Sequence, residues 1–509
     1  MYKLLLCWRY LRTRYIALAS IISVMLGVAT MIVVNSVMEG FTHEMKDRIH
    51  GILSDLVFES QALDGFPDAD SRMAEIRKVA GQYISGMSPT VHVPAMLSYS
   101  YGRDYINRQV TVIGVDEATY STVSDFGQFL QHPDNRKKLD FKLKEGGYDT
   151  LDHQATDLTK VQVRREMQVA GWEYRRRKAK YFSRVSVPEG SLEGNPFQKA
   201  AKSGDSASAE GKQAAEGTDF DPAKEQWTGC VLGIGLCAYR SADGGDGFFA
   251  LPGDDVEISY PTAGQPPKVL SAKFTATDFY ESKMNEYDSN FVFVPIRKIQ
   301  ELRGMVDPST GIAKCNAIQI RLKEGADLDM VRDLLRSSFP PQKYKVSSWR
   351  DKEGALLAAV QVETAVLNVL LFMIIAVAGF GILAIFYMIV FEKTRDIGIL
   401  KSLGAGQYGI MSIFLGYGLS LGVVGASVGL VLGLLFVRYI NEIADVLGRI
   451  TGQPVFDPSI YYFQKIPTIV EWFTVSWIFL GAMIIAVLAS ILPARRAALL
   501  HPVEALRYE

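Results

Sequence analysis

The sequence predicts a membrane protein with four transmembrane α-helices, one N-terminal and three C-terminal, and a large α+β extracytoplasmic domain inserted between the first and second helices. Two observations support this fold class. Four long segments are apolar throughout, and residues 39–365, between the first two, are mostly polar and carry strand-like runs. A helix rises about 1.5 Å per residue, so about 20 apolar residues cross a hydrocarbon core of roughly 30 Å. Four crossings would place both termini on the same side of the membrane.

The first span is predicted at residues 15–38, which contain no charged side chain. A cleaved signal peptide would have a shorter apolar stretch that ends in small residues, so we expect this segment to be retained as a helix. Apolar residues continue beyond it at about helical spacing, which predicts an amphipathic stalk that extends outward. These residues are Phe41, Met45, Ile49, Leu53 and Leu56.

The other three spans are predicted at residues 366–391, 412–437 and 472–492. None of the four spans contains Asp, Glu, Lys, Arg or His, whereas proton relays and ion pathways normally need such groups inside the membrane. The sequence therefore disfavours an ion-driven pump. The third span carries a series of glycines whose spacing lets helix backbones approach closely, and packing within the bundle or a dimer seam explains them equally well. They are Gly418, Gly422, Gly425, Gly429 and Gly433.

Basic residues near the span ends predict the orientation, because cytoplasmic flanks retain Lys and Arg. They concentrate in the N-terminal flank 1–14, the loop 392–411 and the tail 493–509, which we therefore expect in the cytoplasm. These residues are Lys3, Arg9, Arg12, Arg14, Lys393, Arg395, Lys401, Arg495, Arg496 and Arg507. By alternation, the domain 39–365 and the loop 438–471 face outward. We expect a multi-pass protein of the cytoplasmic (inner) membrane with both termini in the cytoplasm and the large domain in the periplasm or its equivalent.

The outer domain contains β-rich runs separated by Gly, Pro or Asp, followed by helical patterns. The predicted strands cover residues 83–101, 108–116, 230–239, 256–260, 269–277, 291–295 and 317–322. Asp327 is placed to cap a helix that continues through Phe339. From Asp351 a helical pattern runs unbroken into the second span, which predicts a second stalk.

Residues 117–228 interrupt this pattern as an insertion. The stretch 200–223, rich in Ser, Gly, Ala, Lys and Glu, is typical of a disordered or loosely held loop, and we assign no fold to the insertion. A basic run with interleaved aromatic residues precedes that stretch. It contains Arg164, Arg165, Arg175, Arg176, Arg177, Lys178 and Lys180. Contact with anionic headgroups or an acidic partner is one interpretation, and a solvated helix face is the favoured one.

The sequence has no GxxxxGK[ST] motif for nucleotide binding and no HExxH motif for zinc. The GxGxxG match at 404–409 lies between two spans rather than in a βαβ unit. A net charge of −1 gives no indication of nucleic-acid binding. Because no CxxC pair or histidine cluster occurs, we expect no structural metal. Cys230 and Cys237 could form a disulfide, although two buried free thiols are favoured.

The loop after the second span predicts a short amphipathic helix. Ile397, Leu400 and Leu403 fall on one side of it, and Gly404 is suited to its end. Its charged residues are Glu392, Lys393, Arg395 and Asp396. An interfacial helix on the membrane and a docking element for a cytoplasmic protein are equally good interpretations of this segment alone.

The loop 391–404, the tail 492–507 and the order of one span, large domain and three spans resemble the FtsX-like permease family of ABC transporters. The tail residues that carry this resemblance include Pro493, Arg495, Arg496, Pro502, Glu504 and Arg507. Ser36-Val-Met-Glu-Gly-Phe41 and Val112-Ile-Gly-Val-Asp116 are similar to the lipoprotein-releasing branch, LolC and LolE, which is itself related to MacB-type exporters. The insertion 117–228 departs from that branch.

The resemblance implies a non-enzymatic permease subunit that works as a homodimer or with a related chain. It implies that this chain binds no cofactor, because a separate cytoplasmic ATPase uses ATP and Mg. The segment 392–404 would be the coupling helix, and mechanotransmission through the first two spans would move the outer domains. In the lipoprotein-releasing branch, acyl chains would enter between the first and second spans of the two subunits and leave to a periplasmic carrier. Export of a small molecule or peptide, and activation of a cell-wall hydrolase, are the alternatives.

Overall fold

The computed structural model describes residues 15–62, 64–101, 104–154, 163–184, 220–240, 246–264, 266–451 and 465–501. The chain divides into two compact units. The helical unit comprises the residues up to 46 and those from 355 onward, and the mixed unit comprises residues 47–354. The N-terminal flank, most of the stretch 200–223 and the tail residues Pro502, Glu504 and Arg507 lie outside the described residues.

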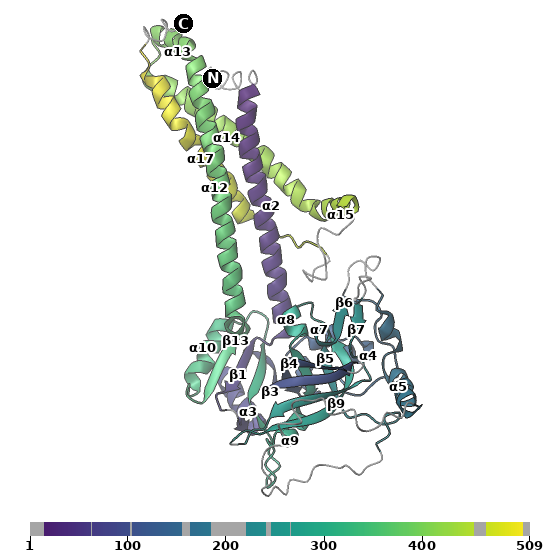
Figure 1. Cartoon of the computed structure of the whole chain (residues 1–509). Helices are drawn as coiled ribbons and strands as arrows, with labels where there is room; N and C mark the ends of the chain where they lie inside the picture. The colour runs from purple at the N-terminus through teal and green to yellow at the C-terminus, as the bar shows by residue number, and fades with distance from the viewer. Residues whose placement is uncertain are drawn as a thin grey trace. The chain divides into compact units, whose positions relative to one another are not determined.

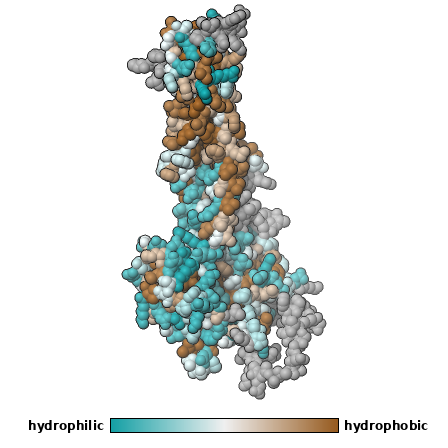
Figure 2. All heavy atoms as spheres, turned by 90° about the vertical axis from the view of Figure 1, so that its left-hand side faces the viewer, coloured by the Kyte–Doolittle hydropathy of each residue, from teal (hydrophilic) through white to brown (hydrophobic). Residues whose placement is uncertain are grey.

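Four helices are long and apolar enough to cross a membrane: α2 (Tyr15–Ile52), α12 (Gly354–Glu392), α14 (Gln407–Arg438) and α17 (Trp472–Leu499). Two shorter helices, α13 (Thr394–Ser402) and α15 (Ile440–Thr451), follow α12 and α14 (Figure 1). On the face seen in Figure 2, hydrophobic residues predominate along part of the spans. The predicted fold class of one N-terminal and three C-terminal spans around a mixed α/β domain is confirmed.

Several helix bounds differ from the predicted ones. The first stalk is real as far as Ile52, but Leu56 lies in strand β1 (Leu56–Ser60), so its assignment to the stalk was wrong. The second stalk is interrupted, because Glu353 leaves the helical conformation between α11 (Trp349–Lys352) and α12. α17 continues seven residues past the predicted end, so the start of the tail motif, including Pro493, is helical. The described part of the loop 438–471, which the sequence predicts to face outward, contains α15.

The glycines of α14 pack against two different helices of the same chain. A Cβ added at Gly418 or Gly422 would lie 2.6 Å from Cβ of Ser490 or 2.8 Å from Cβ of Ala486, both on α17. The other three glycines, Gly425, Gly429 and Gly433, approach α2. A Cβ at position 429 would lie 2.6 Å from the carbonyl oxygen of Met25. The five glycines therefore let α17 and α2 approach α14 closely on two sides, so they serve helix packing within the chain.

A nine-stranded sheet forms the centre of the mixed unit, in the order β13-β1-β12-β3-β4-β10-β5-β9-β8. Its long members are β3 (Ile84–Tyr101), β4 (Asp104–Val115) and β9 (Val269–Tyr280), and the others are β5 (Thr228–Gly233), β8 (Asp255–Pro261), β10 (Phe291–Pro295), β12 (Ala317–Leu322) and β13 (Tyr344–Ser348). β8 also pairs with β3, through Met96↔Ser259 and the next two residues. The strands from β3 through β8 therefore close into a six-stranded ring, and β12, β1 and β13 extend from it.

Six of the seven predicted strands coincide with strands of this sheet, whereas β1 and β13 were not predicted. The predicted strand 230–239 is broken, because β5 ends at Gly233 and the helical turn α7 (Ile234–Cys237) precedes β6 (Ala238–Arg240), which pairs with β7 (Asp246–Phe248). Helix α10 (Leu328–Ser338) has the predicted cap: the Asp327 side chain accepts hydrogen bonds from the backbone N–H groups of Asp329 and Met330. Remaining elements are β2 (Phe66–Pro67), α3 (Ala69–Ala80), α8 (Asn285–Asp288), α9 (Ile296–Leu302) and β11 (Lys314–Cys315).

The described part of the 117–228 insertion is folded, which the sequence did not predict. It contains η1 (Tyr120–Thr122), η2 (Phe126–Phe129), α4 (Pro133–Lys137), η3 (Arg165–Val169) and α5 (Trp172–Arg184). Phe126 is buried, and its ring lies 4.2 Å from that of Phe293 and 5.2 Å from that of Tyr280, centroid to centroid. The insertion thus supplies part of the core.

The three cysteines in the described residues, Cys230, Cys237 and Cys315, are free and buried. The favoured interpretation of Cys230 and Cys237 as buried thiols is therefore confirmed. Burial raises the pKa of the Cys315 thiol to about 12, so it is protonated at neutral pH.

Candidate functional site at helix α13

Helix α13 is separated from both neighbouring spans by defined breaks. At its start, Lys393 leaves the helical conformation, and its ammonium lies 2.6 Å from the carboxylate of Asp396. The Thr394 hydroxyl donates to the carbonyl oxygens of Val390 and Phe391, at 3.0 and 2.8 Å. At the other end Gly404 has φ +93°, a conformation that glycine adopts without strain. These local contacts make α13 a separate short helix rather than an extension of α12.

The apolar residues of α13 and its continuation divide between the interior and the surface. Ile397 is buried and packs into the core of the helical unit, next to a cavity of about 20 Å³ lined by residues of α13 and α14. Leu403 is 79% exposed, and Tyr408, at the start of α14, is 89% exposed. Ile397, Leu400 and Leu403 were predicted to share one side of the helix. In the structure they do not, because Ile397 is buried and anchors the helix whereas Leu403 is exposed at the surface.

Lys401 connects α13 to the end of α17. Its ammonium donates to the carbonyl oxygen of Ala498 at 2.7 Å and to that of Leu500 at 2.6 Å. The last carbonyls of a helix lack intrahelical partners and carry a partial negative charge, so a cation there is favourable. Sequence reasoning used Lys401 only as a marker of orientation. The pairing joins positions 97 and 99 residues apart, and no local pattern signals it.

The start of the predicted tail motif, residues 492–499, forms the last two turns of α17. Pro493, Ala494, Ala497 and Ala498 are buried, whereas Arg495 and Arg496 are exposed. The guanidinium of Arg496 lies 5.8 Å from the centre of the Tyr387 ring on α12, within the range of a cation–π contact. The end of α17 is thus in contact with α12 through Arg496 and with α13 through Lys401.

The surface that remains around α13 mixes charged and apolar side chains. Glu392, Arg395, Ile399 and Leu403 are exposed along it. Such a mixture on a rigid helix suits contact with another protein, and it offers no nucleophile beside a base. Among the described residues, no cluster of His, Cys, Asp and Glu could hold a metal ion.

At the other end of the helical unit, the Ser36–Gly40 segment of α2 packs against residues 465–471. The backbone N–H of Ile469 donates to the carbonyl oxygen of Ser36 at 2.9 Å. A Cβ at Gly40 would lie 2.5 Å from the carbonyl carbon and oxygen of Pro467. Gly40 thus allows the loop before α17 to lie directly on α2, which gives this segment a structural use within the chain.

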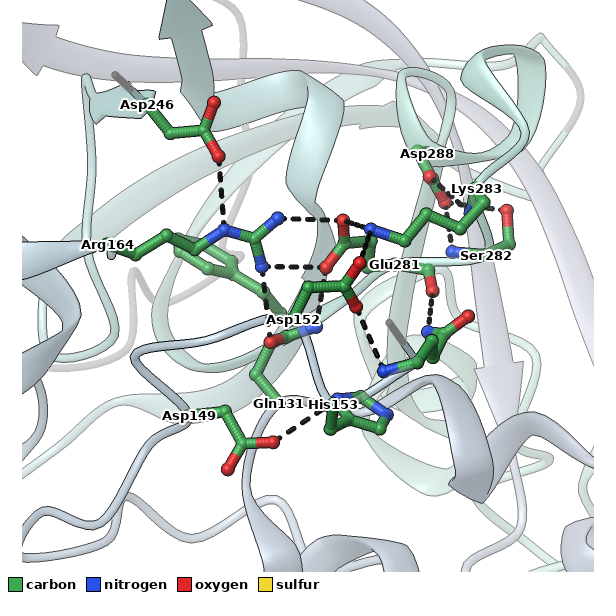
Figure 3. A network of polar contacts seen from close by, with 12 residues as sticks. Gln131, Asp149, Asp152, His153, Arg164, Asp246, Glu281, Ser282, Lys283 and Asp288 are labelled. Atoms are coloured by element: carbon green, nitrogen blue, oxygen red, sulfur yellow. Dashed lines mark hydrogen bonds and ion pairs between the residues drawn. The ribbon is translucent and has the colours of Figure 1, made fainter. Parts of the chain in front are cut away.

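Charged residues of the mixed unit form a buried network, shown in Figure 3. Arg164, just before η3, donates twice to the carboxylate of Glu281, at 2.7 and 2.8 Å, and its Nε lies 3.1 Å from Asp246. Lys283 pairs with Glu281 on another side and with Asp152 at 2.7 Å. Burial would raise the pKa of Glu281, but the charges of Arg164 and Lys283 overcome this and hold it well below its usual range. The network ties the insertion to the end of β9.

The basic run of the sequence is therefore split between two environments. Arg164 and Arg175 are buried, and Arg175 pairs with Asp255 at 2.7 Å. Arg177 is exposed and pairs with Glu173 one turn away on α5. The favoured interpretation as one solvated face was wrong for the buried arginines, because carboxylates distant in the sequence pair with them.

Comparison with known families agrees with this architecture. Residues 368–502 match the FtsX-like permease C-terminal family, and residues 17–140 match the MacB-like periplasmic core domain. The first match covers α13 and its contacts with α17, and the second covers α2 and the strands up to β4. The resemblance to FtsX-like ABC transporter permeases is confirmed.

Individual relatives include lipoprotein-releasing permeases. The lipoprotein-releasing system transmembrane protein LolC of Xylella fastidiosa strain 9a5c is 28% identical over 281 residues, 55% of this chain and 64% of the relative. LolE of Haemophilus influenzae is 26% identical, over 55% of this chain and 65% of its own length. An ABC transporter permease of Bacillus subtilis, YknZ, described as uncharacterized, is 26% identical over 48% of this chain and 55% of its own length. The chain thus spans less than two thirds of these relatives.

Proposed function

We propose that this chain is the permease subunit of an ABC transporter in which a separate ATPase drives the extraction of lipoproteins from the outer leaflet of the cytoplasmic membrane. The observation that carries the proposal is the construction of α13. This short helix is anchored by Ile397, connected to α17 by Lys401 and exposed at Arg395, and the residues that flank it, Glu392 and Leu403, are exposed as well. Force applied to its exposed side would reach α17 through the Lys401 contacts and α12 through the short turn at Lys393.

In this proposal the termini and α13 are cytoplasmic, and the mixed unit lies outside the cytoplasm. The chain works with a second permease, identical or related, and with an ATPase that binds ATP and Mg. Extraction needs such a drive, because each buried methylene is worth about 0.8 kcal/mol and the acyl chains of a lipoprotein bring several dozen. Spontaneous release would be negligible. The similarity to permeases named as lipoprotein-releasing supports this substrate class.

A charge reversal at α13 tests the docking step. We expect Glu392→Lys with Arg395→Glu to abolish co-purification of the ATPase while membrane insertion persists. A matched control reverses Glu442 and Arg449, two exposed residues of opposite charge on α15. The control should leave association unchanged. Equal association in the α13 double variant would contradict docking at this helix.

Mass spectrometry of what co-purifies from gently solubilised native membranes tests the substrate. An ATPase together with acylated lipoproteins, retained without ATP and released in a trapped ATP state, is the expected result. Normal distribution of lipoproteins in cells that lack this chain would reject extraction.

Export of a small molecule or peptide is the second candidate. The match of residues 17–140 to the MacB-like periplasmic core domain favours it, because that part of the chain is not specific to the lipoprotein-releasing branch. Drug sensitivity without lipoprotein retention in a strain lacking the chain would support this candidate. If instead the activity of a cell-wall hydrolase rises and falls with ATP turnover, and no substrate is transported, the complex acts in signalling.

A further inference from the structure

Helix α15 has one apolar face whose residues are exposed in the described part of the chain. Ile443, Val446, Leu447 and Ile450 recur at helical spacing and are 39%, 55%, 45% and 76% exposed, and none of the residues of α15 is buried. Successive residues of a helix are 100° apart, so these four side chains share an arc of about 100°. The opposite face carries Asn441, Glu442, Asp445 and Arg449. The helix is therefore amphipathic, with its apolar face outward.

The position of α15 in the chain shows what that face meets. It starts two residues after α14 ends at Arg438, and only Tyr439 lies between them. The last turns of α14 expose Val431, Leu435 and Phe436, at 54%, 47% and 44%, which in a membrane-spanning helix is the lipid-facing surface. Tyr439, 50% exposed, continues that surface into α15. In Figure 1, α15 leaves the end of α14 at a sharp angle and runs away from α12 and α17.

From this continuity we propose that α15 is an interfacial helix, whose apolar face inserts into the headgroup and acyl boundary of the leaflet at which α14 ends. A helix that leaves a span at its boundary and exposes one apolar face would otherwise place four large side chains in water. The polar face carries Glu442 and Asp445 against the single basic residue Arg449, so attraction to anionic lipids contributes little. Anchoring then rests on apolar burial and on the covalent link to α14.

Contacts within the helical unit give the anchor a consequence for α2. The Asn441 side chain accepts a hydrogen bond from the backbone N–H of Ile466 at 2.8 Å and donates to its carbonyl oxygen at 3.3 Å. Three residues later, Ile469 bonds to Ser36 on α2. With α15 at the bilayer surface, these contacts hold the Ser36–Gly40 segment of α2 at a fixed depth relative to that surface. The proposal requires only that α14 spans the membrane, and it stands whatever the permease moves.

Depth-dependent fluorescence quenching tests the proposal on the full chain in lipid nanodiscs. Cysteine replaces Val446 or Ile450 on the apolar face, Arg449 on the polar face, or Phe436 on α14 as a lipid-facing reference, all in a Cys7→Ser background. Each variant carries a bimane label, and phosphatidylcholine brominated near the glycerol end of its acyl chains is the quencher. The cysteines at 230, 237 and 315 are buried and serve as an unlabelled background.

We expect labels at 446 and 450 to be quenched at least threefold more than the label at 449, and to a similar extent as the label at 436. The ratio should not change when anionic phosphatidylglycerol is added or when salt is raised. Equal weak quenching at 446, 450 and 449 would overturn the proposal, whether water or a partner protein covers the face. Quenching at 436 confirms that α14 is inserted, so a failure at α15 is distinguishable from misfolding.

Discussion

The two units of this protein differ in the side chains that they leave exposed. In the helical unit, large apolar residues such as Phe372 and Trp477 are more than half exposed, whereas Phe386 is buried and glycines lie at the helix contacts. In the mixed unit, aromatic residues such as Phe58, Phe279 and Phe293 are fully buried, and charged residues are buried beside them as pairs. Each pattern is stable only in its own solvent, lipid for the first and water for the second.

Polar groups stabilise the two units in different ways. Along the spans, hydroxyl groups can donate to a carbonyl of the preceding turn, as Ser23 does to Ala19 and Ser490 does to Val487. In the mixed unit, Arg164 and Glu281 stabilise each other, because without its partner each charge would stay buried with less compensation: Glu281 would keep only Lys283 as a charged partner, and Arg164 only Asp246. Substitutions should therefore lower the free energy of unfolding by different amounts in the two units.

Removing one partner of the buried pair should have the largest effect. We expect Arg164→Ala to lower the free energy of unfolding of the mixed unit by about 3–5 kcal/mol, because Glu281 keeps only Lys283 as its cationic partner. The measurement is the rate at which the buried thiols of Cys230 and Cys237 react with a thiol reagent across a urea series in detergent. Arg177→Ala in the same basic run is the control, and its exposed pair should cost only about 0.3–0.5 kcal/mol. Similar losses in both variants would contradict the assignment of Arg164 as a buried structural residue.

Raising the pH should weaken the mixed unit, with a slope set by two other buried acids. Burial raises the pKa of Asp278 and of Asp288 to about 7, above the unfolded value of 3.8. A raised carboxyl pKa gives stability that is present below pH 4 and is lost as the pH rises through 7. Between pH 5 and 7 we expect the free energy of unfolding of the mixed unit to fall by about 2–3 kcal/mol in total. Each acid can contribute at most about 1.4 kcal/mol per pH unit, so the expected loss lies below the upper bound for two acids.

The same thiol assay as a function of pH measures that slope. Asp278→Asn should make it shallower, whatever the variant costs at one pH, because one titrating group is removed. Glu281 has a lowered pKa, so its contribution to the stability of the mixed unit is lost only at acid pH. A slope between pH 5 and 7 that is unchanged in the variant would show that Asp278 does not titrate there.

Adding a methyl group at a helix contact should cost less than breaking the ion pair. A Cβ at Gly429 would meet the Met25 carbonyl oxygen at 2.6 Å, so α14 and α2 must separate, and we expect Gly429→Ala to cost about 1–3 kcal/mol. Gly481 on α17 has nothing within 4 Å of the added Cβ, so Gly481→Ala should be neutral or slightly stabilising. SDS-driven unfolding, followed by tryptophan fluorescence, compares the two. If Gly429→Ala were as stable as Gly481→Ala, the α14–α2 packing described above would be incorrect.

The sequence predicted what depends on local composition and missed what depends on distant partners. The four spans were located because a long uncharged stretch is a signal in itself, and the strand 291–295 because β-branched and aromatic residues are bounded by turns. The folded insertion was missed because its stabilising contacts lie outside it, such as Arg164 with Glu281, 117 residues away. At the candidate site, the sequence located α13 and its glycine end. The sequence did not predict the contact of Lys401 with the end of α17 or the burial of Ile397.

The Lys401 contact should have the smallest energy and the most specific consequence. We expect Lys401→Met to reduce ATP-dependent substrate release about tenfold, close to 1.4 kcal/mol, because it removes the charge-assisted hydrogen bonds to Ala498 and Leu500. Association with the ATPase should persist, since the exposed side of α13 is unchanged. Lys401→Arg should restore much of the release, because a guanidinium can also donate to these carbonyls. If Lys401→Met lost association and release together, the residue would only support the fold of α13. If ATP turnover by the bound ATPase continued at its normal rate while release fell, the lost step would be the transfer of movement from α13 to α17.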